Sequence, residues 1–248
     1  MQKKYSISIV NYLNTLPFVY GLQQHKIDEI ADLQFDIPAV CAEKLLAKKV
    51  DIGLVPIAIL AKMDTYRLLT DYCIGTTGVV DSVKLFSTVP LSEIKTILLD
   101  YQSKTSVELV KILARDYWKI SAEFIDAEPG FETKINGTTA AVIIGDRTFS
   151  IHNTFAYEYD LAAEWKKLTG LPFAFAVWAS HEKIEDREFL KAFNNALKFG
   201  VEHIDEALAS HTNKHPNFDP KDYLHNKISY KLDSEKLRAI DLFIGKIF

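Results

Sequence analysis

The sequence predicts an α/β fold divided into two lobes, and two observations carry this prediction. From residue 5 to about residue 62, short apolar segments typical of strands alternate with amphipathic helical segments, which indicates a mostly parallel sheet. Between Tyr66 and Ser87 this alternation gives way to short strands separated by Gly78 and Asp81. We place the crossing into a second lobe there, and a chain of 248 residues is long enough for one large domain or two modest lobes.

The first lobe opens with a strand, a loop and a helix. Tyr5–Ile9 alternates polar and apolar residues, as a strand does. Leu16–Leu22 is an apolar and aromatic run that predicts the first helix. Thr15 is placed to cap this helix, and Pro17 falls in its first turn, where a missing N–H costs little.

The following segments continue the strand–helix pattern up to the first crossing. We expect a strand at Leu33–Ile37, an amphipathic helix at Ala39–Lys49, a buried strand at Asp51–Pro56 and the start of a helix at Ile57–Lys62. Short strands are expected at Tyr66–Leu69, Tyr72–Thr76 and Val83–Ser87.

The remaining apolar segments predict the second lobe and the return to the first. We expect strands at Thr96–Asp100, Glu123–Ile125 and Ala140–Ile144, a helix from Thr105, and a helix at Tyr159–Leu168. Phe173–Ala179 is the expected returning strand, and helices are expected at Glu185–Leu208, around Pro220–Leu224 and at Asp233–Ile247. The expected first lobe comprises residues 1–86 and 174–248, and the second comprises residues 87–173.

The composition argues against several classes of protein. A net charge of −4 provides no basic surface for nucleic acid, and an anionic ligand must be attracted by local groups. Two cysteines do not make a disulfide framework. The first residues precede a strand that alternates with serine rather than a continuous apolar stretch, so we expect no signal peptide, no membrane span and a cytoplasmic protein.

The loop after the first strand is the first candidate site. It carries the amides of Asn11 and Asn14, the phenol of Tyr12 and the hydroxyl of Thr15. Ligands of open α/β sheets bind at the carboxyl ends of strands, so these side chains are placed to meet one. A well-capped turn without a ligand explains the same residues.

The segment Gln102–Glu108 is the second candidate site. Thr105 and Glu108 have the spacing of a capping box at a helix start. A helix start offers unpaired N–H groups and a partial positive charge, here surrounded by three hydroxyls and the Lys104 ammonium, so it suits a carboxylate or a phosphate. A capped helix after a polar loop is the alternative.

The end of the buried strand Ala140–Ile144 is the third candidate site. Gly145 permits close approach of the backbone, and Asp146 either contacts a ligand hydroxyl or caps the next helix.

Other kinds of site are not indicated. The sequence has no glycine-rich phosphate loop and no dinucleotide motif. His211 and His215 have the spacing of metal ligands on a helix, but no third ligand lies near them in sequence, so we expect a solvated surface. Neither Cys41 nor Cys73 lies in a motif that suggests a nucleophile. We therefore expect no metal and no cofactor.

Several stretches resemble, in order and spacing, the MqnA family, the chorismate dehydratases of the futalosine pathway of menaquinone biosynthesis. They are Tyr12–Pro17, Asp51–Pro56, Ser82–Ser87, Asp100–Ser106, Ile144–Asp146 and Tyr159–Trp178. Asn11 departs from the pattern, since serine is expected there in much of the family, and the C-terminal helices match only in type.

The resemblance implies a periplasmic-binding-protein-like fold of type II, in which two α/β lobes enclose a ligand cleft. It implies loss of water from chorismate to give 3-(1-carboxyvinyloxy)benzoate. A proton leaves the carbon that bears the enolpyruvyl ether, the neighbouring hydroxyl is expelled, and aromatisation drives the reaction. Chorismate is then the expected small-molecule partner, no cofactor is needed, and the protein is a monomer or a homodimer.

Two other functions share this fold and stay open. One is 1,4-dihydroxy-6-naphthoate synthase, the sister enzyme of the same pathway. The other is a non-catalytic cytoplasmic solute-binding domain, because a fold alone does not determine a function.

The resemblance also points to residues of the cleft that suit the two carboxylates of chorismate. Ser103, Thr105 and Ser106 suit one of them through N–H and hydroxyl donation. Ser82 and Ser87 are placed to hold the other.

Asn14 is expected to face the ring of the substrate. There it orients a water, the leaving hydroxyl or a carboxylate that acts as base, since an amide is itself a poor base. Asp146, next to Gly145, is the more conventional base or hydroxyl acceptor. Tyr12 and Trp178 form apolar walls or belong to the core.

Overall fold

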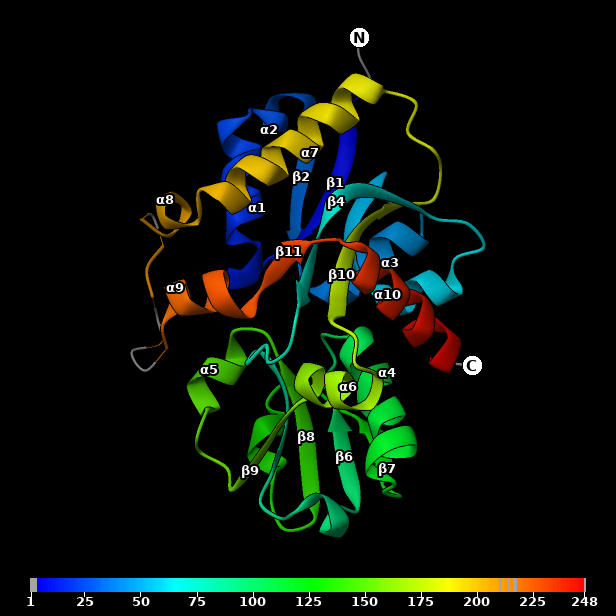
Figure 1. The fold of residues 1–248 in the computed structure, drawn as a ribbon, viewed down its shortest axis with the longest axis vertical. Coiled ribbons are helices and arrows are strands. Elements are labelled where there is room, and N and C mark those ends of the chain that lie inside the picture. Colours follow the sequence, from blue (N-terminus) through cyan, green and yellow to red (C-terminus); the bar gives the residue numbers. More distant parts are fainter. Residues whose placement is uncertain (1–3, 210, 214, 216–217, 248) are drawn as a thin grey trace.

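A computed structural model describes residues 4–209, 211–213, 215 and 218–247 of the chain. These residues form two β-sheets that lie one above the other in Figure 1, each with helices packed on it. The prediction of an α/β fold with two lobes is confirmed. The chain passes between the sheets twice, in the segments 77–82 and 170–172.

The first sheet has the strand order β11-β4-β10-β3-β1-β2. Its strands are β1 (Tyr5–Val10), β2 (Ala31–Asp36), β3 (Ile52–Pro56), β4 (Arg67–Thr76), β10 (Phe173–Ser180) and β11 (Ser229–Lys231). The strands β1, β2 and β3 are parallel, whereas β10 runs antiparallel between β3 and β4. The last strand, β11, pairs with β4, so the C-terminal segment completes the lobe that the N-terminus begins.

The second sheet has the strand order β7-β6-β8-β5-β9. Its strands are β5 (Val83–Ser87), β6 (Thr96–Leu99), β7 (Glu123–Asp126), β8 (Thr139–Ile144) and β9 (Tyr157–Asp160). β6 is parallel to β7 and β8, whereas β5 is antiparallel to β8 and β9. Helices α4 (Thr105–Ile112) and α6 (Leu161–Thr169) contact this sheet and each other.

Helix α1 (Leu16–Gln24) crosses α7 (Arg187–Glu202) in the first lobe at backbone contact. A Cβ added at Gly200 would lie 1.8 Å from the Pro17 carbonyl oxygen, and one at Gly21 would lie 1.9 Å from the Ala196 carbonyl oxygen. Only glycine permits this approach. Because α1 follows directly on the loop after β1, the crossing fixes where that loop lies.

The remaining helical elements range from short turns to the C-terminal helix. The α-helices are α2 (Ile27–Ile30), α3 (Pro38–Leu46), α5 (Arg147–Ile151), α8 (Ile204–Ala209), α9 (Pro220–Asp222) and α10 (Ser234–Ile247). The 3₁₀ helices are η1 (Leu13–Thr15), η2 (Ile57–Lys62), η3 (Leu91–Glu93) and η5 (Phe131–Lys134), and the π-helical turns are η4 (Leu113–Trp118) and η6 (Tyr223–Lys227).

The first crossing lies earlier in the chain than the predicted boundary at residue 86. Val83–Ser87 forms β5, which pairs with β8 and β9 of the second sheet. The two short strands expected at 66–76 are one continuous strand, β4. Strands on the two sides of a crossing have the same local pattern, so only their pairing assigns them to a sheet.

The helix expected at Tyr159–Leu168 begins only at Leu161. Tyr157–Asp160 instead forms the edge strand β9. The Asp160 carboxylate accepts the N–H groups of Ala162 and Ala163 at 3.1 and 3.0 Å, so the helix start is set by this cap. The long helix expected at Glu185–Leu208 is divided into α7 and α8, and β11 was not expected from the sequence.

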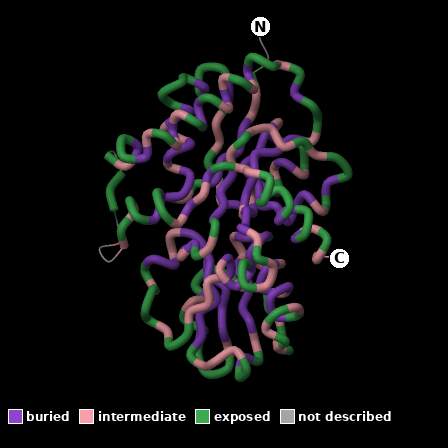
Figure 2. The backbone as a smooth tube through the Cα atoms, in the orientation of Figure 1, coloured by how far each residue is buried: buried purple, intermediate pink, exposed green. Residues whose placement is uncertain are grey.

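One buried apolar cluster contains residues of both lobes. Figure 2 shows buried backbone segments, in purple, in the centre of each lobe. It includes Ile7 of β1, Leu85 of β5 and Trp165 of α6. The Trp165 ring packs edge-on against Phe173 of β10 and Phe243 of α10. The lobes are therefore joined by packed side chains as well as by the two crossings.

Candidate active site

A pocket lies where the two lobes meet, and its empty space of about 530 Å³ includes open solvent. Its polar lining consists of Tyr12, Asn14, Ser82, Ser103, Thr105 and Ser106. Its other lining residues are Gly145 and the apolar residues Val10, Pro38, Pro56, Ile74, Val80, Val83, Ile144, Phe175 and Ala176. Among the described residues that line it, none carries a carboxylate, an ammonium, a guanidinium or an imidazole. The pocket is thus a polar but uncharged site.

Thr15 ties the loop after β1 together instead of capping α1. Its hydroxyl oxygen lies 2.6 Å from the Val10 carbonyl oxygen and 2.7 Å from that of Tyr12, and its side chain makes no capping hydrogen bond. The predicted cap is therefore wrong, although Pro17 does lie in the first turn of the helix. The hydroxyl closes the loop on itself and holds Tyr12 and Asn14 at the edge of the pocket.

Tyr12 reaches from the first lobe onto the second. Its hydroxyl donates to Gln102 Oε1, and its ring lies on Gly145, where an added Cβ would come within 2.8 Å of the ring. Gly145 also has a φ of 68°, which disfavours any other residue. Burial, together with the charge of Asp100, raises the pKa of the Tyr12 phenol, so this group stays protonated at neutral pH.

Asn14 is connected to Ser82 through a residue from the C-terminal segment. The Tyr223 hydroxyl donates to Ser82 Oγ at 2.7 Å and accepts from Asn14 Nδ2 at 3.4 Å. The Tyr230 hydroxyl donates to the Asn14 carbonyl oxygen at 2.9 Å. Asn14 lines the pocket, and its Oδ1 is buried without a hydrogen-bond partner among the described residues.

The start of α4 supplies the opposite wall, but its predicted capping box is wrong. The Ser103 hydroxyl accepts the Ser106 N–H and donates to Ser106 Oγ, both at 3.0 Å. The Thr105 hydroxyl makes its hydrogen bonds outside α4. It accepts the Ala58 N–H and donates to the Phe175 carbonyl oxygen, each at 3.2 Å. Ser103 is therefore the residue that caps this helix, and Thr105 joins the lobes.

Asp146 lies next to the pocket without lining it. Both of its carboxylate oxygens accept the Leu13 N–H at 3.2 Å, across the interface between the lobes. Burial raises the pKa of this carboxyl, while the bond from Leu13 acts in the opposite direction. The side chain makes no capping bond to α5. In this position Asp146 holds the loop after β1 against the second lobe.

Ser87 and Trp178 do not lie at the pocket. Ser87 is at the opposite end of β5 from Ser82, and its hydroxyl bonds with the Val89 backbone. Trp178 is buried among Phe18 and Phe193, with ring centroids 5.9 and 5.0 Å away. Of the two residues expected as apolar walls, only Tyr12 lines the pocket, and Phe175 supplies the aromatic surface from β10.

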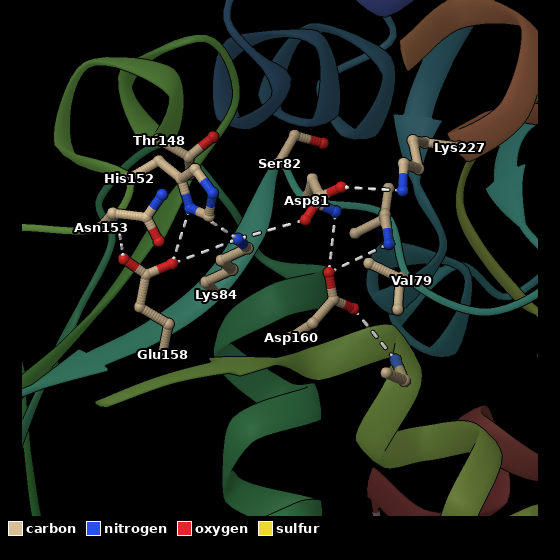
Figure 3. Close-up of polar contacts among 12 residues, drawn as sticks. Val79, Asp81, Ser82, Lys84, Thr148, His152, Asn153, Glu158, Asp160 and Lys227 are labelled. Atoms are coloured by element: carbon tan, nitrogen blue, oxygen red, sulfur yellow. Dashed lines mark hydrogen bonds and ion pairs between the residues drawn. The ribbon is translucent and has the colours of Figure 1, made fainter. Parts of the chain in front are cut away.

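Of the nearby cations Lys84, Arg147 and Lys104, the first two are held by carboxylates. The Lys84 ammonium lies 3.2 Å from both Asp81 and Glu158, and Figure 3 shows these side chains converging with His152 beside the first crossing. Arg147 pairs with Asp100 and Glu132. Lys104 is exposed to solvent. Local recognition of an anion in the pocket therefore depends on neutral donors.

At His211 and His215 we expected a solvated surface and no metal site. His211 is exposed, and His215 Nδ1 lies 3.1 Å from Ser150 Oγ. No group of three or more His, Cys, Asp or Glu residues within the described part of the chain is arranged to hold a metal ion. A search of the same residues finds no helix with the length and apolar character needed to span a membrane.

Sequence patterns did not reveal Gln102, Phe175, Tyr223 or Tyr230 as parts of this region. Gln102 lies in a stretch whose hydroxyls and ammonium suggested anion binding. Nothing in the sequence indicated a role for the Gln102 amide itself. Tyr223 and Tyr230 come from the C-terminal segment, and their partners are 141 to 216 positions away. No local pattern in a single sequence indicates such contacts.

Comparisons with known proteins agree with this architecture. A family model described as menaquinone biosynthesis matches residues 5–248. A curated chorismate dehydratase from Thermus thermophilus is 26% identical over 236 residues, which covers 86% of this chain and 85% of that protein.

Solved structures show the same fold. The crystal structure of a protein from Archaeoglobus fulgidus matches with a TM-score of 0.73 and 15% identity, covering 98% of this chain and 95% of that one. A Candida albicans protein, described as having the generic periplasmic binding protein fold, matches with a TM-score of 0.63 and 13% identity over 99% of this chain and 90% of that one. The expected periplasmic-binding-protein-like fold is confirmed.

Proposed function

The chain belongs to the menaquinone biosynthesis family, and from this premise we propose that it is a chorismate dehydratase, a carbon–oxygen lyase that acts in the cytoplasm. The reaction removes water from chorismate and gives 3-(1-carboxyvinyloxy)benzoate. The observation that carries the proposal is the uncharged pocket between the lobes, which is lined by hydroxyls of both lobes and by Asn14, whose amide oxygen is buried without a partner among the described residues.

The hydroxyls suit the carboxylates of chorismate. The Ser106 hydroxyl and the N-terminal turn of α4 bind one carboxylate, because N–H groups, a hydroxyl and the helix dipole all favour negative charge there. Ser82, on the first crossing, binds the other. Thr105 contributes by holding α4 against the first lobe, since its hydroxyl is already bonded on both sides.

Asn14 Oδ1 accepts a hydrogen bond from the substrate hydroxyl that is later expelled. An amide oxygen orients this group, and most of the lining around it, including Phe175 and Val83, is apolar. Elimination then requires a base for the ring proton. The C–O bond breaks as the ring becomes aromatic, and the expelled hydroxide takes up the proton held by the base, so that one water leaves. The described lining offers no ionised side chain for this step, since the Tyr12 phenol is protonated. The base is therefore either a carboxylate of the substrate itself or Asp146, behind Gly145.

The lobes must act together in this reaction. We propose that the functional division follows the crossings at 77–82 and 170–172, so that Asn14 belongs to one lobe and the α4 start to the other. The bonds Tyr12–Gln102 and Leu13–Asp146 close the pocket between them. Closure of this kind excludes water while the hydroxyl leaves.

The test is direct. Purified protein is incubated with chorismate, with and without a chelator, and the products are followed by mass spectrometry. We expect the loss of one water, the appearance of the benzoate product and no effect of the chelator. Folded protein that binds chorismate without converting it would reject the proposal in favour of a solute-binding domain.

A further inference from the structure

The Tyr223 hydroxyl occupies a central position behind the pocket. It lies on the π-helical turn η6, in a side chain that is 1% exposed, and its ring packs edge-on against Phe149. Its oxygen is 2.7 Å from Ser82 Oγ and 3.4 Å from Asn14 Nδ2. One hydroxyl therefore contacts two polar residues of the pocket lining.

The chemistry of these groups gives the chain of hydrogen bonds a direction. A phenol has one proton, and Tyr223 donates it to Ser82. The phenol oxygen then accepts from the Asn14 amide NH₂ group. Burial raises the pKa of this phenol, so the proton stays on it at neutral pH.

The direction of these hydrogen bonds determines which donors and acceptors the pocket presents to a ligand. Ser82 Oγ has received a proton from Tyr223, so its own proton is available for donation. Asn14 has turned its NH₂ group towards Tyr223, so its Oδ1 remains as an acceptor, and this atom is buried without a partner. The pocket thus presents a donor at Ser82 and an acceptor at Asn14, rather than two groups that can each rotate to suit any ligand.

Tyr230 holds the same loop in a different way. Its hydroxyl donates to the backbone carbonyl oxygen of Asn14 at 2.9 Å, and its side chain is 5% exposed. This bond fixes the main chain and leaves the orientation of the side-chain amide to Tyr223. The two tyrosines are therefore a matched pair: each is a buried phenol bonded to Asn14, but only one contacts the amide.

We propose that Tyr223 is a positioning residue that sets the donor at Ser82 and the acceptor at Asn14, so that the site selects a ligand with a hydroxyl for Asn14 and an anionic oxygen for Ser82. The inference rests on the proposed function, in which the expelled hydroxyl meets Asn14 and a carboxylate meets Ser82. It also implies that product is released readily, because the product lacks this hydroxyl and leaves Asn14 Oδ1 unpaired.

The variant Tyr223→Phe tests the proposal, with Tyr230→Phe as the matched control. Each substitution removes one buried hydroxyl and keeps the ring. We expect Tyr223→Phe to lower kcat on the order of tenfold, because the Asn14 amide is free to turn, and Tyr230→Phe to lower it by less than about threefold. Both variants should melt at similar temperatures. Equal effects of the two substitutions on kcat would overturn the proposal.

A double variant separates positioning from general structural damage. In an Asn14→Ala background, Tyr223→Phe should change kcat by less than about twofold, because the amide that it orients is gone. A loss that multiplies with that of Asn14→Ala would reject the proposal.

A measurement on the unaltered protein does not depend on the folding of any variant. The inhibition constant of the product should lie at least about tenfold above the KM for chorismate. Product that binds more tightly than this would overturn the inference. Absence of any turnover by the unaltered protein would instead reject the proposed function, whereas turnover that is insensitive to Tyr223→Phe would reject only the role of Tyr223.

Discussion

The two walls of the pocket are built from similar polar residues, but their hydrogen bonds are organised differently. At the start of α4, the hydroxyls of Ser103, Ser106 and Thr105 bond to one another and to backbone groups. On the opposite wall, Asn14 is held from behind by two tyrosines, and its Oδ1 has no partner. The hydroxyls of the first wall are largely hydrogen-bonded within the protein, whereas the second wall contains one buried acceptor that has no partner among the described residues.

This difference indicates how binding and chemistry are divided between the lobes. A helix start whose polar groups are already hydrogen-bonded has little effect on the free energy of folding. It can still bind an anion, because its remaining N–H groups and the helix dipole favour negative charge. A buried acceptor without a partner costs stability until a ligand reaches it, as is common for groups at functional sites. We therefore assign anion binding to the α4 wall and orientation of the reacting hydroxyl to the Asn14 wall.

Asn14→Ala should have the largest effect. Loss of a preorganised group that acts on the reacting atoms typically lowers kcat by roughly 100- to 1,000-fold, and we expect that range with a much smaller change in KM. Steady-state kinetics with chorismate measure it. Asn11→Ala is the control, since Asn11 is an exposed amide of the same loop. Equal losses in the two variants would show that the loop, and not the amide oxygen, matters.

Ser106→Ala should weaken binding without abolishing turnover. A hydrogen bond to a charged group contributes about 1.5–3 kcal/mol, which corresponds to roughly a ten- to hundredfold increase in the dissociation constant of the product. Calorimetry at two salt concentrations measures this.

Lys104→Ala is the matched control for Ser106→Ala, because the exposed ammonium belongs to the same turn. The substitution should weaken the free energy of product binding by less than about 1 kcal/mol. If Lys104→Ala abolishes binding and Ser106→Ala is neutral, a point charge holds the substrate and the assignment of the α4 wall is wrong.

Thr105→Val should affect stability more than affinity. The substitution keeps the shape of the side chain but leaves the Ala58 N–H and the Phe175 carbonyl without their partner. Unpaired buried groups cost about 1–3 kcal/mol each, so the denaturation midpoint should fall clearly while KM changes by less than about threefold. A large increase in KM with unchanged stability would instead place the Thr105 hydroxyl on the substrate.

Asp146→Asn should have the smallest effect on turnover if the carboxylate only holds Leu13. An asparagine oxygen accepts the same N–H, so kcat should stay within about threefold, whereas loss of a catalytic base would lower it by roughly 100-fold or more. The kinetic result therefore decides between Asp146 and a substrate carboxylate as the base.

The pH dependence of stability gives a second signature of Asp146. Its pKa is raised in the folded protein, so the carboxyl contributes stability below its unfolded pKa, and this contribution is lost as the pH rises through the folded value. The melting temperature of Asp146→Asn relative to wild type should therefore increase from pH 4 to pH 7. A difference that stays constant with pH would contradict the raised pKa.

The sequence predicted the elements of this pocket better than their connections. The loop after β1, the strand before Gly145 and the helix after Ser103 each have a local pattern, so their positions were predictable within a few residues. Ser82 and Ser87 were treated alike although they lie at opposite ends of β5, roughly 16 Å apart in an extended strand. The capping box failed because tertiary contacts with Ala58 and Phe175 compete for the Thr105 hydroxyl.

The sequence separation between Asn14 and the two tyrosines that bond to it has a consequence for folding. Their bonds to Asn14 join residues that are 209 and 216 positions apart, so the loop after β1 is completed only when the segment after α7 packs against it. Contacts between residues so distant in sequence form slowly, because the entropy of loop closure is lost before the contact stabilises the fold. A variant truncated after α7 would retain Asn14, Ser82 and Ser106 but lack both phenols that hold the Asn14 loop.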